Sequence, residues 1–190
     1  MPGIRPDIRS RLAACVRPLW RARGPQRLLQ RQDGNAAVEF ALVAAPFFAL
    51  LFAILETALV FFAQQVLQSA TTEASRLIMT GQAQSGSTTA AEFQQAVCAD
   101  AGALFNCADI YVNVQTFSSF SSVSQLNPLS GGNFNSGSMN YSIGTQGDIE
   151  LVQVFYQWPV YTAPLGFSLS NMNGNSRLLV ATAVFRNEPY

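Results

Sequence analysis

Two carboxylates, Glu39 and Glu56, lie inside a long apolar stretch and are the residues of this chain best placed to do chemistry. From Ala36 to Ala63 the sequence has 28 residues and no basic side chain. A charged carboxylate near the middle of a bilayer costs at least about 2.5–3.5 kcal/mol, so it is usually paired with a cation or protonated. The two positions lie roughly 100° apart around a helix, so they need not share one partner.

Each carboxylate has more than one interpretation. Glu39 lies near the start of the stretch, where its side chain either reaches the membrane surface or binds a cation. Glu56 lies about two-thirds of the way along, where the ordinary interpretation is a protonated side chain inside a helix bundle. We treat Glu39 and Glu56 as intramembrane polar residues with separate roles.

Cysteine is the other reactive residue type, and the chain has three. Cys98 and Cys107 are nine residues apart and flank Gly102, a spacing that suits a short disulfide loop in an oxidising compartment. The alternative is a pair of reduced, buried thiols. Cys15 lies far upstream in a basic segment and has no evident partner. The sequence thus predicts a Cys98–Cys107 disulfide and no metal site.

The residues that most enzymes need are missing. The sequence has no histidine, which removes the commonest general base and metal ligand. Serine-rich stretches without a histidine base are not typical of hydrolases, and no glycine-rich phosphate loop or metal-spaced carboxylate cluster occurs. We predict no catalytic residue, no cofactor and no small-molecule substrate, so an enzyme tethered to a membrane is the least favoured alternative.

A helix must position Glu39 and Glu56. About 20 mostly apolar residues are enough to cross the ~30 Å hydrocarbon core, and the run is longer than the roughly 7–15 apolar residues of a cleaved secretory signal. We predict a transmembrane helix over 35–63. Residues 64–79 contain no Gly or Pro, so we expect the helix to continue to Met79, and Gly81 supplies the stop. Pro46 predicts a kink or local unwinding.

Charge is distributed unevenly, although the formal net charge is zero. Eight of the eleven basic residues precede the apolar stretch, and after it three arginines face seven acidic residues. Basic flanks stay in the cytoplasm, so we expect a cytoplasmic N-terminus.

An organelle transit peptide or a nucleic-acid-binding arm is a less favoured interpretation of this basic leader. Residues 12–20 either form a short amphipathic helix or belong to a disordered leader.

The arrangement around Gly34 resembles that of a type IV prepilin: a basic leader, a glycine, Glu39 five residues later, Phe40 and an apolar helix. More narrowly, the sequence from Arg31 to Val43, followed by Pro46, resembles the start of the TadE-like family. These proteins are minor pseudopilins of the Flp (tight adherence) pilus and related secretion systems. Segments near the end of the chain, 154–160 and 179–189, look like strands of the same family.

This resemblance implies a processing site and a set of partners. A prepilin peptidase would cut between Gly34 and Asn35, with Glu39 and Phe40 in the motif that it uses. The partners would be the inner membrane, the peptidase, other pilins or pseudopilins and the pilus assembly platform, with no nucleic acid. The alternative is an uncleaved, bitopic envelope anchor that acts as a structural or interaction subunit.

The remainder of the chain predicts a small mixed domain. Residues 89–92 read as a capping box that opens a second helix to about Ala103. Residues 110–117 alternate apolar and polar side chains, with Asn113 on the polar side, and 149–158 and 176–187 are further strands. Residues 82–88 read as a polar linker. The Ser- and Gly-rich segment 118–147 reads as a long loop that is either functional or mobile.

Taken together, these patterns predict an α+β, pilin-like fold. A long N-terminal membrane-spanning helix extends into a small exported domain with a second helix and a three- or four-stranded antiparallel sheet. We assign 1–34 to the basic cytoplasmic leader, 35–63 to the transmembrane helix and 64–190 to the exported domain. The expected location is the bacterial inner membrane, single-pass, with the N-terminus cytoplasmic and the C-terminal domain periplasmic.

Overall fold

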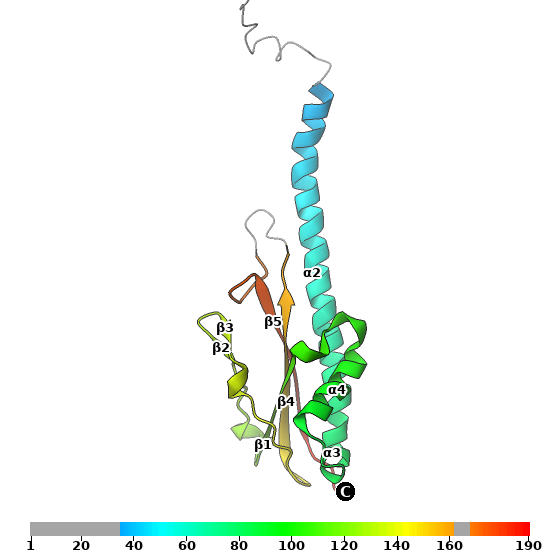
Figure 1. Cartoon of the computed structure of the whole chain (residues 1–190), viewed down its shortest axis with the longest axis vertical. Coiled ribbons are helices and arrows are strands. Elements are labelled where there is room, and N and C mark those ends of the chain that lie inside the picture. The colour runs from blue at the N-terminus through cyan, green and yellow to red at the C-terminus, as the bar shows by residue number, and fades with distance from the viewer. Residues whose placement is uncertain (1–34, 162–167) are drawn as a thin grey trace, which may run out of the picture. The chain divides into compact units, whose positions relative to one another are not determined.

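The computed structural model describes residues 35–161 and 168–190 and shows a long helix that packs against a three-stranded antiparallel sheet (Figure 1). The α+β prediction is therefore confirmed. Predictions for residues 12–20, Cys15 and Gly34 lie outside the described residues. The elements in chain order are α2 (Asn35–Met79), α3 (Gln82–Ser85), α4 (Ala90–Ala101), η3 (Gly102–Leu104), η4 (Cys107–Asp109), β1 (Ile110–Phe117), η5 (Phe120–Ser122), β2 (Leu129–Ser130), β3 (Asn133–Phe134), η6 (Ser136–Ser138), β4 (Ile149–Pro159) and β5 (Ser176–Arg186).

Helix α2 is 45 residues long and ends where the sequence predicts. Gly81 follows it with φ of 79°, a left-handed conformation that glycine adopts without steric cost. The chain stays helical through Pro46, so the expected local unwinding is not present. Proline removes one backbone donor, but its fixed φ is itself helical. The predicted polar linker after Gly81 contains one helical turn, α3.

The C-terminal part of α2 carries a buried stripe. Apolar residues such as Leu67, Ala70 and Ile78 are almost fully buried. Thr71 and Ser75, two polar residues of the same part of the helix, are buried as well. Their hydroxyl groups donate to the carbonyl oxygens four residues earlier, at 2.7 and 2.6 Å, which satisfies them inside the core.

Helix α4 begins at the predicted capping box. The Thr89 hydroxyl accepts from the Glu92 backbone N–H at 3.3 Å, and the Glu92 carboxylate accepts from the Thr89 N–H at 2.7 Å. The hydrogen bonds from Thr89 lower the pKa of Glu92. Phe93 and Val97 are fully buried and belong to the same hydrophobic core as residues of the sheet.

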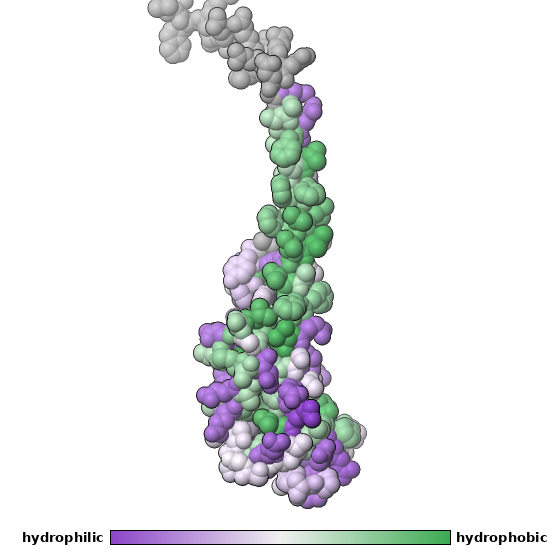
Figure 2. Space-filling model, turned by 90° about the vertical axis from the view of Figure 1, so that its right-hand side faces the viewer, coloured by the Kyte–Doolittle hydropathy of each residue, from purple (hydrophilic) through white to green (hydrophobic). Residues whose placement is uncertain are grey.

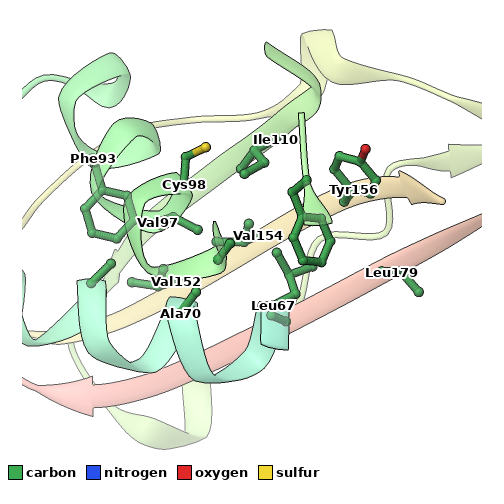
Figure 3. Packing of buried hydrophobic residues seen from close by; sticks show 14 of the residues in the cluster. Leu67, Ala70, Phe93, Val97, Cys98, Ile110, Val152, Val154, Tyr156 and Leu179 are labelled. Carbon is green, nitrogen blue, oxygen red and sulfur yellow. The ribbon is translucent and has the colours of Figure 1, made fainter. Parts of the chain in front are cut away.

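The sheet has the strand order β1-β4-β5 with both pairs antiparallel. Val154, in the central strand, lies opposite Val112 on β1 and Ala181 on β5, so one face of the sheet is apolar. Figure 3 shows this face packed against side chains of α2 and α4. The strand bounds match the predictions to within one residue.

The opposite face of the sheet is covered by the Ser- and Gly-rich segment. Phe134 packs against Tyr111 and Phe155, with ring centroids 4.8 and 6.3 Å apart. Asn113 lies on this face, as the alternation predicts, but it is fully buried beneath the same segment. The prediction of a half-buried strand, with its polar side exposed, is therefore wrong at this position. Its amide oxygen accepts from the Asn140 backbone N–H at 2.9 Å. The predicted long loop therefore forms a second layer on the sheet, with β2 and β3 as a separate two-stranded ribbon.

Candidate functional site

The first turn of α2 carries the predicted processing motif. The Asn35 side-chain amide donates to the Glu39 carboxylate at 2.6 Å. One helical turn separates the two residues, which places both side chains on one face. Phe40 is 71% exposed. Gly34 lies outside the described residues, so only the Asn35 side of the predicted cleavage site is described.

Glu56 lies about one turn before the first buried residue of α2, Val60. Its carboxylate accepts from the backbone N–H of Tyr161 at 2.7 Å. Tyr161 follows β4, so this bond joins α2 to the end of the sheet where β4 finishes and β5 begins (Figure 1). We call this the β4–β5 end of the domain. The structure thus does not bring Glu56 to Glu39; it places Glu56 against a segment 105 residues away.

A small cavity of about 70 Å³ lies next to the contact between Glu56 and Tyr161, on the side of Thr57 and Val60. Its lining combines one face of α2 with the start of β5 and the residues before it. Arg177 is the one charged residue in the lining, and it donates to the Leu169 carbonyl oxygen at 3.0 Å. The lining residues are Thr57, Val60, Phe61, Gln64, Leu169, Arg177 and Leu179. The cavity offers room for little more than water, so it has no features of a substrate site.

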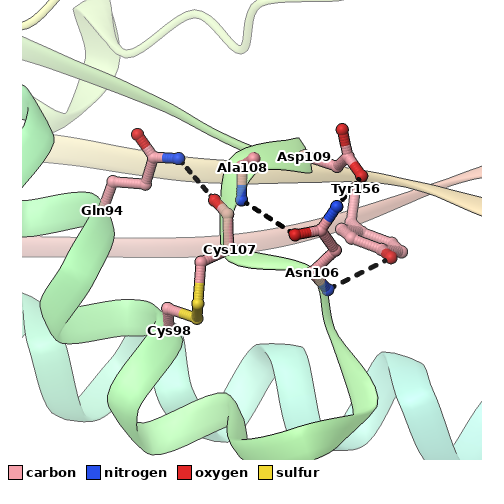
Figure 4. Close-up of a disulfide and its surroundings, with 7 residues drawn as sticks. All are labelled: Gln94, Cys98, Asn106, Cys107, Ala108, Asp109 and Tyr156. Carbon is pink, nitrogen blue, oxygen red and sulfur yellow. Dashed lines mark hydrogen bonds between the residues drawn. A yellow bond between two sulfur atoms is a disulfide. The ribbon is translucent and has the colours of Figure 1, made fainter.

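Cys98 and Cys107 are joined by a disulfide, with Cα atoms 5.5 Å apart (Figure 4). Cys98 lies in the last turn of α4, and Cys107 begins η4. Gly102 allows the tight return of the chain with φ of 70°, and the Gln94 side chain donates to the Cys107 carbonyl oxygen. The bridge ties the end of α4 to the start of β1.

Glu150 is a fully buried carboxyl group that sequence reasoning counted only as part of the acidic balance. It accepts from the Gly144 backbone N–H at 2.7 Å, from the Thr116 hydroxyl at 3.1 Å and from the Asn187 amide at 3.4 Å. These bonds favour the charged form, but burial outweighs them and raises the pKa of Glu150 to about 7. The carboxyl group joins β1, the segment before β4 and the end of the chain.

Gly144 is required beside this carboxyl group. A Cβ atom at that position would overlap the Glu150 carboxylate and lie 2.7 Å from a Thr116 side-chain carbon. The nearby Asp148 carboxylate accepts from the Thr145 backbone N–H at 2.8 Å, which lowers the pKa of Asp148. Within residues 35–161 and 168–190, no three His, Cys, Asp or Glu residues are grouped to hold a metal ion. The arrangement around Glu150 is structural: its carboxyl group connects three segments of the chain by hydrogen bonds.

Comparison with known families gives one match. Residues 34–76 match the family of TadE-like proteins. The match begins at Gly34 and extends along α2 to Arg76, so it includes the predicted processing motif and both Glu39 and Glu56. The resemblance drawn from the sequence is confirmed for this region. No curated protein and no solved structure matches the chain.

The TadE-like region is also the part of the structure suited to a membrane. By length and composition, α2 is a helix that can cross a bilayer, and none of its most apolar 18-residue window is buried. Figure 2 shows mainly hydrophobic side chains on the part of the helix that extends from the domain, and a mixture of hydrophilic and hydrophobic ones on the domain itself. The long apolar N-terminal helix indicates a membrane anchor.

Proposed function

We propose that this protein is a membrane-anchored minor pseudopilin that takes part in the assembly of an Flp-type (tight adherence) pilus or a related secretion system. The observation that carries the proposal is the TadE-like match, which starts at the glycine of the processing motif and covers the anchor helix. The role is structural: the chain acts through its helix and its exported domain, with other pilins and the assembly platform as partners.

The proposal includes cleavage between Gly34 and Asn35 by a prepilin peptidase. Glycine lets the backbone approach a protease closely, because it has no side chain. Cleavage removes the eight leader arginines, which otherwise hold the N-terminus at the cytoplasmic face. It also creates an amino group on Asn35, whose side chain already contacts Glu39. A carboxylate held in lipid needs a cation, and the new amino group of a neighbouring subunit supplies one.

The N-terminal residue of the mature protein tests this proposal. We expect wild-type protein from cells with the peptidase to begin at Asn35, and the Gly34→Ala variant to retain the leader. Ala37→Gly is a matched control: it also exchanges glycine and alanine, in the reverse direction and inside the helix, and it leaves the Gly34–Asn35 bond intact. If wild-type protein still begins near Met1, the chain is an uncleaved bitopic anchor and the pseudopilin proposal fails.

A further inference from the structure

The exposure of α2 changes along its length in a way that marks a boundary. Residues 35–55 include no buried side chain, whereas Val60 is 5% exposed and Ala63 is fully buried in the domain core. These 21 residues make about 31 Å of helix, which equals the ~30 Å hydrocarbon core. A span that ran to Ala63, as the sequence predicts, would place core residues of the domain in lipid.

Glu56 lies at the end of the exposed stretch and is held by protein. The Tyr161 backbone N–H donates to its carboxylate at 2.7 Å. At a membrane surface, a carboxylate is hydrated as well as hydrogen-bonded, so it avoids the cost that it has inside the hydrocarbon. The β4–β5 end of the domain meets α2 at this same position, so the domain begins where the apolar length is complete.

Exposed aromatic and apolar side chains surround the junction. Tyr161 is 84% exposed, and Leu59, Phe61 and Phe62 on α2 are each more than half exposed. At 1.5 Å per residue, 59–62 lie about 5–9 Å beyond Glu56 along the helix. The headgroup layer on each side of a bilayer is about 5–8 Å thick. Tyrosine is enriched in this layer, where its ring is apolar and its hydroxyl group is wet.

We propose that the membrane span of α2 ends just before Glu56 and that the β4–β5 end of the domain rests on the lipid headgroups, with Tyr161 and Phe61 in that layer. This inference depends on the proposed membrane anchor and adds the depth at which the anchor sits. The partner is the outer surface of the inner membrane. The domain is then fixed close to the bilayer, not held away from it on a free helix.

The test measures depth in the membrane with spin labels on the full chain. The starting variant is Cys15→Ser, in which Cys98 and Cys107 are bridged and no thiol is free. Single cysteines replace four exposed residues: Leu50, Phe61, Tyr161 and Phe120. Each is labelled with a nitroxide in vesicles of phosphatidylethanolamine and phosphatidylglycerol. Collision with oxygen reports lipid, and collision with a water-soluble nickel complex reports water.

Phe120 is the matched control for Tyr161. It is an exposed aromatic residue, and it follows β1 at Phe117, which pairs with Ile149 at the opposite end of β4. We expect the Leu50 label in lipid, the Phe120 label in water, and the Phe61 and Tyr161 labels between them, with a clear loss of nickel collisions relative to Phe120. A correctly mapped Cys98–Cys107 bridge shows that each variant has folded.

Four other results are informative. A Leu50 label in water rejects the anchor and with it the proposed function. A Leu50 label in lipid, with Phe61 and Tyr161 as accessible to nickel as Phe120, means that the domain stands off the membrane. A Phe61 label as deep as Leu50 moves the boundary past Glu56. Protection of both junction labels from oxygen and nickel means that protein covers them. The last three results each overturn the inference and leave the anchor intact.

Discussion

The side chain of Gln68 pairs with the backbone of Thr182 as a neighbouring β-strand would. The Gln68 amide oxygen accepts from the Thr182 N–H at 3.1 Å, and its amide nitrogen donates to the Thr182 carbonyl oxygen at 3.0 Å. One turn earlier, Gln64 donates to the Val180 carbonyl oxygen at 2.8 Å. Because β5 is an edge strand, α2 thereby covers backbone groups that would otherwise invite pairing with another chain.

Removing this pairing should destabilise the domain. Gln68→Ala deletes both hydrogen bonds to Thr182 and leaves these partly buried backbone groups without their partners, so we expect a loss of about 1–3 kcal/mol in the free energy of unfolding. Gln65→Ala is the matched control, because Gln65 is an exposed glutamine on the same helix. Denaturant unfolding of the full chain in detergent measures both. Equal midpoints for the two variants would show that the pairing adds no stability.

Glu150 should make the domain more stable in weak acid than in weak base. Its pKa is about 7 in the folded protein and 4.5 in an unfolded chain, so the folded state binds the proton more tightly. The resulting stability is fully present below about pH 4.5 and is lost as the pH rises through 7. The difference amounts to about 3 kcal/mol. The measurement is the free energy of unfolding of the full chain between pH 5 and pH 8.

Glu150→Gln is the matched variant, because glutamine keeps the shape and does not titrate. We expect it to flatten the stability profile over this pH range. Asp148 and Glu92 have lowered pKa values, so their contributions change only in more acidic solution and do not obscure the result. A wild-type profile that rises from pH 5 to pH 8, or one that Glu150→Gln leaves unchanged, contradicts the assignment.

Local patterns predicted the elements of this fold well. The period-two alternation in 110–117 gave β1 with the observed bounds, and Thr89 with Glu92 gave the start of α4. The glycine-to-glutamate spacing that predicted the processing motif is likewise local. Each of these signals is contained within a few residues, so it can be read without knowing what packs against it.

Contacts between distant segments could not be read in this way. Asn113 alternates correctly as a polar residue of a strand, but the 118–147 segment folds back and buries it. Gln68 lies 114 residues from Thr182, and Glu56 lies 105 residues from Tyr161. A polar residue outside the apolar stripe of α2 looks solvent-exposed in sequence. Only the position of β5 beside the helix shows what Gln68 binds.

The Cys98–Cys107 bridge should be present in the mature protein. In the loop-entropy account, closing nine residues stabilises the fold by about 2–3 kcal/mol. Peptide mapping without reduction should recover the two cysteines in one linked fragment, and Cys98→Ser should lower the free energy of unfolding by that amount. Rapid alkylation that finds both thiols free in mature protein would exclude the bridge.

Topology is a separate prediction from the charge asymmetry. The arginine-rich leader should stay in the cytoplasm while the domain is exported. A reporter that is active only after export, fused at Phe120, should be active, and a reporter that needs the cytoplasm should be silent there. Activity in the reverse pattern would place the domain on the cytoplasmic side.

The carboxylate of Glu39 should matter for assembly more than for cleavage. Asn35 lies one turn away, and its side chain contacts this carboxylate at 2.6 Å. After cleavage, Asn35 would be the first residue, so its positively charged amino group would lie at the same level of the helix as Glu39. In an assembled bundle that cation comes from a neighbouring subunit. We therefore expect Glu39→Ala protein to be cut after Gly34 in cells with the peptidase, and then to be recovered poorly with other pilins after crosslinking.

Glu39→Gln separates charge from hydrogen bonding, because glutamine keeps the shape and one acceptor oxygen but has no negative charge to form an ion pair with an ammonium group. If charge pairing drives assembly, Glu39→Gln should be recovered as poorly as Glu39→Ala. Wild-type recovery of Glu39→Gln would instead assign the role to the hydrogen bond with Asn35. Should Glu39→Ala retain the leader as fully as Gly34→Ala does, Glu39 acts in recognition by the peptidase, and its proposed place in assembly is lost.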